Sequence, residues 1–435
     1  MPFNRRDFLK TAGLHAGVLL MRPTVGAAEA PAIVRATPHV VVIGAGAFGG
    51  WTALYLRERG AKVTLVDAYG PGNSRSTSGD ETRGVRTSYG DRGDNSALWV
   101  KWASQAIKRW KEWDAEWAKP LQRRLFFTTG DIILRPDWDN WLRETRRLWD
   151  ENRIAYEVLT ADEVRRRWPQ IRLNDAIQLG IYERDAGVVR ARRACESVAE
   201  VFMRKGGTVI TAHASLGGAS GRRLDGVNLQ PGEALRADAY VFACGPWLPK
   251  VFPEIMRERM RTPIGHVFYF GTPPGDARFT HPNLPSWNVP GVTGWPSLDN
   301  DARGFRVRGG GGRPPSDPDT SVRFIDARYH EGARNILRQW FPALARAPLL
   351  ETRACHYESC VSRNFVVDRH PDYDNVWIAG AGNAEGFKFG PVMGEYIAKR
   401  VLGEKTDAAI DAAFRIPEET YDPSLPDAVR AGLRS

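Results

Sequence analysis

The sequence predicts an α/β fold in which a discontinuous nucleotide-binding domain carries an inserted antiparallel-sheet domain. Three observations lead to this prediction. A β-branched run at 40–43 is followed by a glycine-rich turn and a helical pattern, as in a parallel βαβ unit. Apolar strands followed by glycine-containing turns recur at 237–247 and 376–402. The intervening residues, above all 255–350, are rich in proline and tryptophan and favour antiparallel, irregular structure.

The first βαβ unit has the Rossmann-like pattern of a dinucleotide-binding site. Gly44 permits a tight turn, Gly46 lets the backbone approach a pyrophosphate, and Gly49 lets the helix pack closely on the strand. The helix begins directly after this turn, so its free N–H groups and its dipole favour phosphate. Asp67 ends the second strand, at 62–67, and is expected to accept hydrogen bonds from a ribose. The motif predicts a dinucleotide and leaves NAD and FAD both open.

Further elements follow from local patterns along the chain. Thr160 and Glu163 predict a capping box at the start of a helix that Pro169 ends. Residues 125–134 have the composition of paired strands, and 69–84 are expected to form a loop. Helices are predicted at 95–117, 187–205, 327–340 and 391–402, and strands at 208–211, 237–243 and 376–380.

Composition excludes several classes of protein. The chain has 435 residues, enough for two or three domains, and its four cysteines are too few for a disulfide-stapled scaffold. No apolar run approaches the roughly 20 residues that span a bilayer. The net charge of +10 is spread over arginines interleaved with acids, and no nucleic-acid-binding motif accompanies it. We therefore expect a solvated basic surface and no nucleic-acid partner.

The N-terminus has the three parts of an export signal. Arg5 and Arg6 precede a short, weakly apolar stretch, and Ala28-Glu29-Ala30 offers a small-x-small cleavage site. This order predicts a twin-arginine signal peptide at 1–30 that engages the twin-arginine export machinery. That pathway carries folded proteins, so we expect the mature protein in the periplasm.

Several motifs together resemble the D-amino-acid-oxidase-type flavoproteins, within them the branch of monomeric sarcosine oxidase and N-methyltryptophan oxidase. The resemblance extends over most of 38–410 and is weakest in 255–350. The motifs that carry it lie at 41–67, 78–86, 244–247, 353–357 and 386–389. It implies FAD as cofactor, a monomeric protein, and oxidation of an amine.

The element pattern and the resemblance divide the chain in the same way. The division is a signal peptide at 1–30, an FAD-binding domain at 38–120, 181–250 and 351–410, a substrate domain at 121–180 and 251–350, and a tail at 411–435.

Cofactor-binding residues follow from the fingerprint and from matching positions of the family. They are Gly44, Gly46, Ala47, Phe48, Gly49, Asp67, Ser78, Thr82, Arg83, Gly245, Cys355, Gly382, Gly386, Phe387 and Lys388. The cysteine matching Cys355 is bonded covalently to the flavin in the sarcosine oxidase branch, which implies the same bond here. A buried inert thiol and a disulfide with Cys360 are the alternatives.

Active-site residues are carried over from the same resemblance. It implies catalytic roles for Arg83, Arg306, Lys388 and Tyr357, and substrate binding by Arg86, Lys388 and Tyr357, with Arg86 and Lys388 holding a carboxylate. Two positions depart from the branch. Arg306 stands where the oxidases have a lysine that promotes reaction with oxygen, and the expected pocket histidine falls in the glycine run 309–312.

The expected function is FAD-dependent oxidation of a secondary or primary amine, in particular an N-substituted amino acid, to an imine. Oxygen would be the acceptor and hydrogen peroxide the second product. A periplasmic dehydrogenase that passes electrons to a quinone or another carrier is the alternative that Arg306 suggests. An FAD-binding protein without turnover and a nicotinamide dehydrogenase are the remaining alternatives.

Overall fold

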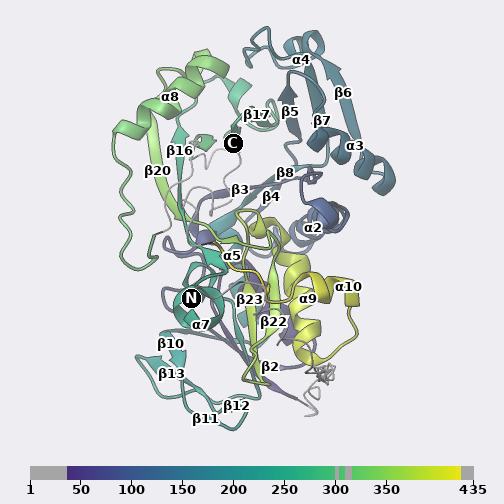
Figure 1. The fold of residues 1–435 in the computed structure, drawn as a ribbon. Helices are drawn as coiled ribbons and strands as arrows, with labels where there is room; N and C mark the ends of the chain where they lie inside the picture. Colours follow the sequence, from purple (N-terminus) through teal and green to yellow (C-terminus); the bar gives the residue numbers. More distant parts are fainter. Residues whose placement is uncertain (1–36, 299–302, 309–315, 423–435) are drawn as a thin grey trace, which may run out of the picture. The chain divides into compact units, whose positions relative to one another are not determined.

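The computed structural model describes residues 37–298, 303–308 and 316–422 (Figure 1). The predicted signal peptide at 1–30 and the glycine run 309–312 lie outside the described residues, as does the tail beyond residue 422. Within the described part of the chain, no helix combines the length and the apolar character needed to cross a membrane.

A six-stranded sheet gathers strands from the start, the middle and the end of the chain. All neighbouring pairs are parallel except the edge pair of β22 and β23. In sheet order the strands are β22 (Val366–Arg369), β23 (Val376–Gly380), β14 (Ala239–Phe242), β1 (His39–Ile43), β2 (Lys62–Asp67) and β9 (Thr208–Thr211). The order confirms a doubly wound α/β sheet built from separated segments.

Both faces of this sheet are buried, as expected for parallel strands. Val40 and Val42 of β1 pack into the core beneath the helices, whereas Val41 and Ile43 face a second core on the other side. Helix α1 (Ala47–Glu58) packs against α9 (Gly390–Leu402) and α5 (Ala191–Arg204) on the first face. Helix α2 (Ser96–Trp117) adds its tryptophans to the same core. The second face is covered by α6 (Leu248–Val251), α7 (Pro253–Met256) and the ribbon of β10 (His213–Leu216) and β13 (Val227–Gln230).

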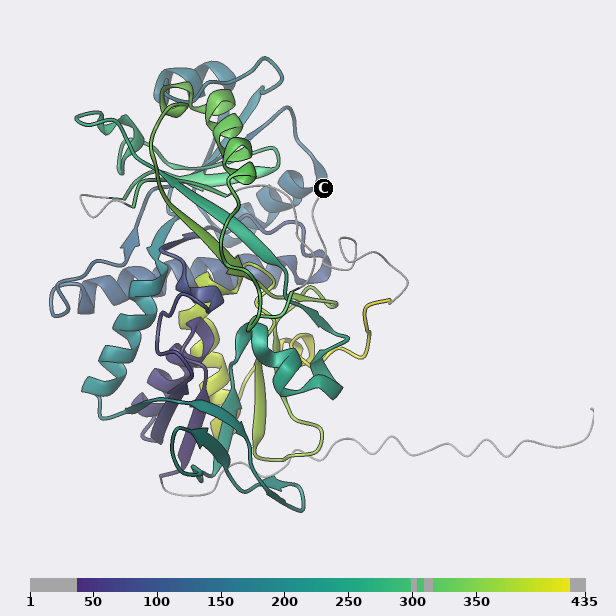
Figure 2. The same cartoon turned by 90° about the vertical axis from the view of Figure 1, so that its left-hand side faces the viewer.

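An eight-stranded sheet forms the second layer, and it is antiparallel except where β17 runs parallel to β5. Helix α8 (Arg328–Trp340) lies beside this sheet (Figure 2), and its buried side chains share a core with the strands. In order the strands are β20 (Leu349–His356), β16 (Ile264–Phe270), β19 (Phe305–Arg308), β18 (Val292–Trp295), β17 (Ser286–Val289), β5 (Asp131–Arg135), β7 (Leu179–Glu183) and β6 (Tyr156–Thr160). Helices α3 (Asn140–Asn152) and α4 (Ala161–Arg167) flank its β5 to β6 end. The predicted fold class is confirmed.

Three predicted elements differ from the structure, because their strands pair with segments that are distant in sequence. Residues 187–190, predicted as the start of a helix, form β8 (Gly187–Arg190), which pairs with β3 (Thr82–Val85) and β4 (Phe126–Phe127). The strand β3 also shortens the loop predicted at 69–84. The strands within 125–134 do not pair with each other, since β4 joins β8 while β5 joins the eight-stranded sheet.

Other local predictions are confirmed. Helix α4 begins with the complete capping box of Thr160 and Glu163. The strands at 208–211 and 376–380 and the helices at 95–117, 327–340 and 391–402 are found within two residues of their predicted ends.

Candidate active site

A cavity of about 640 Å³ lies at the carboxyl ends of β1, β2 and β14, and the glycine turn forms one wall of it. Gly44 has a φ of +104°, and a β-carbon there would lie 2.3 Å from the Ala243 carbonyl oxygen. A β-carbon on Gly49 would lie 1.8 Å from the Gly44 oxygen. Gly49 does not line the cavity, but because it has no side chain, α1 can pack closely on the turn. A side chain at either position would close the turn. The volume is typical of a site for a large organic ligand.

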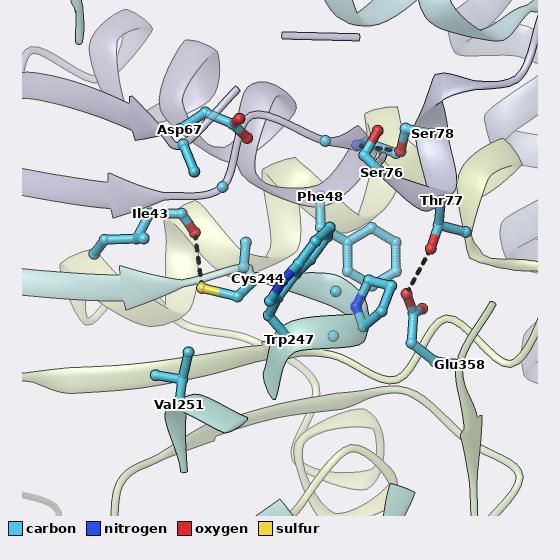
Figure 3. A pocket seen from close by; sticks show the side chains of 18 of the residues that line it. Ile43, Phe48, Asp67, Ser76, Thr77, Ser78, Cys244, Trp247, Val251 and Glu358 are labelled. Carbon is cyan, nitrogen blue, oxygen red and sulfur yellow. Dashed lines mark hydrogen bonds between the residues drawn. The ribbon is translucent and has the colours of Figure 1, made fainter. Parts of the chain in front are cut away.

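The N-terminus of α1 points at this cavity. Gly46, Ala47 and Phe48 line it. The N-cap residue of the helix is Gly46, which has no side chain to cap the helix by a hydrogen bond. Ala47 N–H donates to Ser78 Oγ over 3.1 Å, and Figure 3 shows Ser78 beside this first turn. The remaining positive end of the helix dipole favours the phosphates of a dinucleotide.

Asp67 lies at the end of β2 and lines the cavity beside the glycine turn. Its Oδ2 accepts a hydrogen bond from Ala45 N–H over 2.8 Å, and its Oδ1 accepts one from Tyr69 N–H over 2.9 Å. Burial raises the pKa of this carboxyl, while these backbone donors act in the opposite direction. The carboxylate is therefore held in place at the cavity wall, where it can accept hydrogen bonds from a ribose.

Glu358 is a buried carboxyl on the cavity wall that the sequence analysis missed. Its Oε1 accepts a hydrogen bond from the Thr77 hydroxyl over 3.0 Å, and its Oε2 accepts one from Gly382 N–H over 2.8 Å (Figure 3). Burial raises its pKa. The predicted residues Gly245, Gly386 and Phe387 line the same cavity, as do the unpredicted Asn73, Ser76, Thr77, Trp247 and Asp319.

A second cavity, of about 80 Å³, adjoins the first. Thr77, Arg83, Ala384 and Phe387 line both. The second cavity brings together all the predicted active-site residues. They are Arg83, Arg86, Arg306, Cys355, Tyr357 and Lys388. The predicted residue Thr82 lines neither of the two cavities. Its hydroxyl forms a hydrogen bond with the Tyr269 hydroxyl and accepts one from the Trp295 indole, both over 2.9 Å.

Asp80 is the buried anion between two of these arginines. It is 0% exposed, and its Oδ2 forms an ion pair with Arg83 Nη1 and lies 3.5 Å from Arg306 Nη2. Its Oδ1 accepts from the Tyr269 hydroxyl over 3.0 Å. Burial alone would raise the pKa of Asp80, but Arg83 and Arg306 outweigh burial and hold the pKa below its ordinary value. The sequence analysis missed Asp80, although it lies within the motif at 78–86.

Arg306 is a further cation of the small cavity, from the middle of β19. It is 3% exposed, and its guanidinium carbon lies 3.8 Å from the centre of the Trp295 ring. Among the described residues, its Nε and Nη1 have no hydrogen-bond partner. Burial lowers its pKa, while Tyr269 and Asp80 act in the opposite direction.

Lys388 is buried at the end of the small cavity, with 3% of its surface exposed. Its Nζ donates to Glu385 Oε2 over 2.6 Å and to the Glu385 carbonyl oxygen over 3.0 Å. Burial lowers the pKa of Lys388 to about 8, and Glu385 opposes this fall. Arg86 Nη2 lies 3.9 Å from Glu385 Oε1, and the Tyr89 hydroxyl donates to Oε2 over 3.0 Å. Glu385 is the third acidic residue of the site that the sequence analysis missed, after Glu358 and Asp80.

Comparison with known proteins identifies the family of the chain. Residues 39–400 match the model of the FAD dependent oxidoreductase family, DAO. The chain belongs to this family. It is therefore an FAD-dependent oxidoreductase, and its cofactor is FAD. The predicted resemblance is confirmed.

Curated relatives of this flavoprotein cover nearly the whole chain. Monomeric sarcosine oxidase from Bacillus sp. (strain B-0618) is 25% identical over 404 residues, which are 89% of this chain and 97% of the relative. N-methyl-L-tryptophan oxidase from Salmonella arizonae is 26% identical over 391 residues, or 87% and 98% of the two chains.

Solved structures share the fold. An Amadoriase I mutant from Aspergillus fumigatus has a TM-score of 0.74 and 22% identity, and the match covers 89% of this chain and 91% of that one. Iminodiacetate oxidase from Chelativorans sp. BNC1 has a TM-score of 0.71 and 19% identity over 87% and 98%. L-proline dehydrogenase from P. horikoshii has a TM-score of 0.74 and 17% identity over 86% and 96%.

The residues of the large cavity fit FAD. The glycine turn leaves the space that a β-carbon would fill, α1 offers its N-terminus, and Asp67 stands at the end of β2. The cavity continues into the small one past Arg83 and Phe387. A dinucleotide held by the turn therefore has room to place its reactive ring at the junction of the two cavities.

Cys355 lies at this junction as a free thiol. Arg83 Nη2 is 3.2 Å from its Sγ. Burial raises the pKa of the thiol, and Arg83 acts against that rise. All four cysteines are free, so the alternative of a disulfide between Cys355 and Cys360 is wrong. Cys360 instead lies in β21 (Ser359–Cys360), which pairs with β15 (Met260–Arg261).

Tyr357 completes the small cavity from the end of β20. Burial raises its pKa, and the Arg308 guanidinium lies 5.8 Å from the centre of its ring. Arg308 was not predicted, but it follows Arg306 by two residues on one strand, and that spacing places both side chains on the same face.

Proposed function

We propose that this flavoprotein oxidises a secondary or primary amine to an imine, with oxygen as acceptor and hydrogen peroxide as product. The observation that carries the proposal is the small cavity that opens from the FAD cavity at Thr77, Arg83 and Phe387. Its volume of about 80 Å³ admits a small group rather than a second large ligand. The names of the relatives, a sarcosine oxidase and an N-methyl-L-tryptophan oxidase, support an amine as substrate.

The glycine turn, the N-terminus of α1 and Asp67 would hold FAD, which would supply a hydride acceptor for the carbon next to the amine nitrogen. The protein supplies position, exclusion of water and charge. The rings of Trp295 and Tyr357 wall the small cavity, so an amine held there is shielded from solvent. Arg83 and Arg306 place positive charge at the junction, where it stabilises the negative charge that moves off the substrate.

An N-substituted amino acid as substrate would need cations that are available to bind its carboxylate, here the pair of Arg86 and Lys388, which we call the clamp. Arg86 and Lys388 line the small cavity as predicted, but Glu385 lies beside both. We therefore propose only that the substrate is an amine, and substrate binding does not require a carboxylate on that amine.

A panel of amines added to the oxygen-free holoenzyme tests the proposal. We expect the flavin absorbance near 450 nm to bleach with at least one secondary or primary amine, and to return on aeration with stoichiometric hydrogen peroxide. The absence of bleaching across the panel would refute amine oxidation. Bleaching that air does not reverse, but a quinone does, would support the dehydrogenase instead. Arg306 motivates that second candidate, because arginine keeps the charge of a lysine but does not give up a proton.

We also propose that Cys355 carries FAD covalently. Its thiol lies at the junction of the cavities, with Arg83 close enough to stabilise the thiolate that must attack. Formation of the thioether would release two protons, one from the thiol and one from the flavin methyl group, together with two electrons that would pass to oxygen and give hydrogen peroxide. Acid precipitation should leave yellow protein for the wild type and for Cys360→Ala, and should release FAD from Cys355→Ala. Complete release from the wild type would show that FAD is held without a covalent bond.

Export through the twin-arginine pathway and a monomeric state complete the proposal. The paired arginines at the N-terminus support the first, and the relatives named as monomeric support the second. Light scattering of the purified protein checks the monomer, since a mass twice that of the chain would contradict it.

A further inference from the structure

We propose that Glu385 is a built-in counter-ion of Arg86 and Lys388, so that the active site selects amines without a carboxylate beside the nitrogen. The inference rests on the proposed amine oxidation and names the substrate class for it. Its basis is the arrangement of charge at one end of the small cavity.

Glu385 is bound to the clamp by hydrogen bonds rather than merely being close to it. Lys388 Nζ donates to its carboxylate over 2.6 Å and to its backbone oxygen over 3.0 Å. Tyr89 donates a second hydrogen bond to the same carboxylate oxygen. The other oxygen faces Arg86 and Arg92, each with a guanidinium nitrogen 3.9 Å away. The carboxylate of Glu385 thus stands where the carboxylate of an amino-acid substrate would have to bind.

Local backbone structure holds this pair together. Glu385 immediately precedes the 3₁₀ turn η6 (Gly386–Phe389), and Lys388 lies three residues after it. Residues three apart on a 3₁₀ turn lie one above the other, which keeps the two side chains on one side. The indole of Trp110 also donates to the Lys388 carbonyl oxygen over 2.9 Å, fixing the turn from behind.

The charges behind the clamp oppose a second carboxylate. Asp131 is buried and acts electrostatically on Arg86. Glu183 is buried beside it, but burial raises its pKa to about 8, so it holds its proton at neutral pH and adds no charge. Three cations, Arg86, Arg92 and Lys388, therefore face the protein's own carboxyl groups before any substrate enters. A substrate carboxylate would lose its hydration and meet the negative charge of Glu385 at close range. Such a built-in repulsion discriminates against amino acids without weakening the binding of a simple amine.

Matched pairs of substrates test the selection. Piperidine and pipecolate differ only by the carboxylate, as do N-methylphenethylamine and N-methylphenylalanine. Anaerobic flavin reduction should be faster per unit substrate for the amine of each pair in the wild type. In Glu385→Gln the ratio should shift about 10- to 100-fold toward the amino acid, the worth of one charge-assisted hydrogen bond. Glu385→Asp keeps the charge and should keep the wild-type ratio.

Binding of acetate and benzoate gives a readout that needs no turnover. Changes in the flavin spectrum should give dissociation constants that are about 10- to 100-fold lower in Glu385→Gln than in the wild type. Glu331→Gln removes an exposed carboxylate on α8, paired with Arg338, and should leave both ligands unchanged. The Glu385→Asp protein serves as the folded reference if the glutamine variant loses FAD, since it should still bind the acids weakly.

Two results would overturn the inference. One is a wild-type preference for the amino acid of each pair. The other is an unchanged ratio and unchanged acid binding in a folded Glu385→Gln, which would place the carboxylate site away from this residue. Failure of the proposed function looks different, because then no amine of either kind bleaches the flavin while the titration with acetate still reports on Glu385.

Discussion

Asp80→Asn removes one negative charge from between Arg83 and Arg306 and leaves the shape of the side chain almost unchanged. Asparagine can still accept the hydrogen bond from the Tyr269 hydroxyl at Oδ1. The two guanidinium groups, however, lose their buried counter-ion. We therefore expect the variant to be destabilised by lost charge pairing rather than by altered packing.

The size of the effect follows from the geometry. Two unit charges 3.5 Å apart, as between Asp80 and Arg306, interact by about 5 kcal/mol at an effective dielectric constant of about 20. Removing one partner of a buried ion pair costs about 3–5 kcal/mol in measured cases. With an unfolding entropy of about 2.1 cal/mol/K per residue, 1 kcal/mol corresponds to roughly 1 °C in a chain of 435 residues.

Thermal unfolding of the holoenzyme, followed by flavin fluorescence, measures this loss. Asp80→Asn should unfold about 3–5 °C below the wild type. Asp185→Asn breaks an exposed ion pair with Lys111 and should shift the midpoint by less than about 1 °C. Equal midpoints for the two variants would refute the reasoning, because they would show that the buried charge contributes no more than a surface one.

Three further predictions address stability, cofactor binding and export. Burial raises the pKa of Glu183 to about 8, so the folded protein holds a proton that the unfolded chain loses above about pH 4.5, and stability falls as the pH rises from there to about 8. Glu183→Gln should flatten this fall, by at most about 5 kcal/mol. Unfolding midpoints measured from pH 5 to 9 test this, and parallel curves for variant and wild type would contradict the raised pKa. A β-carbon on Gly49 would lie 1.8 Å from a backbone oxygen of the same turn, so Gly49→Ala should purify with little FAD. Gly332→Ala is the control, because a β-carbon there would have no atom within 4 Å, and this variant should keep its full FAD content. Lysine at both Arg5 and Arg6 should abolish periplasmic accumulation in cell fractionation, and undiminished periplasmic protein would rule out the twin-arginine route.

Local sequence predicted the parts of the fold and the site that local physics determines. The βαβ unit around Gly44 and Gly46 follows from strand composition, turn geometry and helix polarity within about 30 residues. The strand at 187–190 could not be predicted in this way, because its two valines are held by pairing with strands around residues 82 and 126. Tertiary pairing overrides local preference there.

The missed anions make contacts of two kinds. Asp80 acts on Arg306, 226 residues away, and nothing local reports that contact. Asp80 also stands three residues before Arg83, and Glu385 three residues before Lys388, a spacing at which opposite charges pair on a helical turn. Attention to that spacing would have shown that the predicted clamp carries its own counter-ion.

The strand order of the six-stranded sheet also determines when this protein can first bind FAD during synthesis. β1 and β2 emerge early, but β1 pairs with β14 and β14 pairs with β23, which ends at Gly380. At about 5–20 residues per second, a ribosome needs roughly 15–60 s to travel from the end of β2 to the end of β23. During that interval the apolar strands of the glycine fingerprint have no complete sheet to join, and contacts so distant in sequence form slowly. The nascent chain must therefore be protected from aggregation until β23 has been made, when about seven-eighths of the chain is complete.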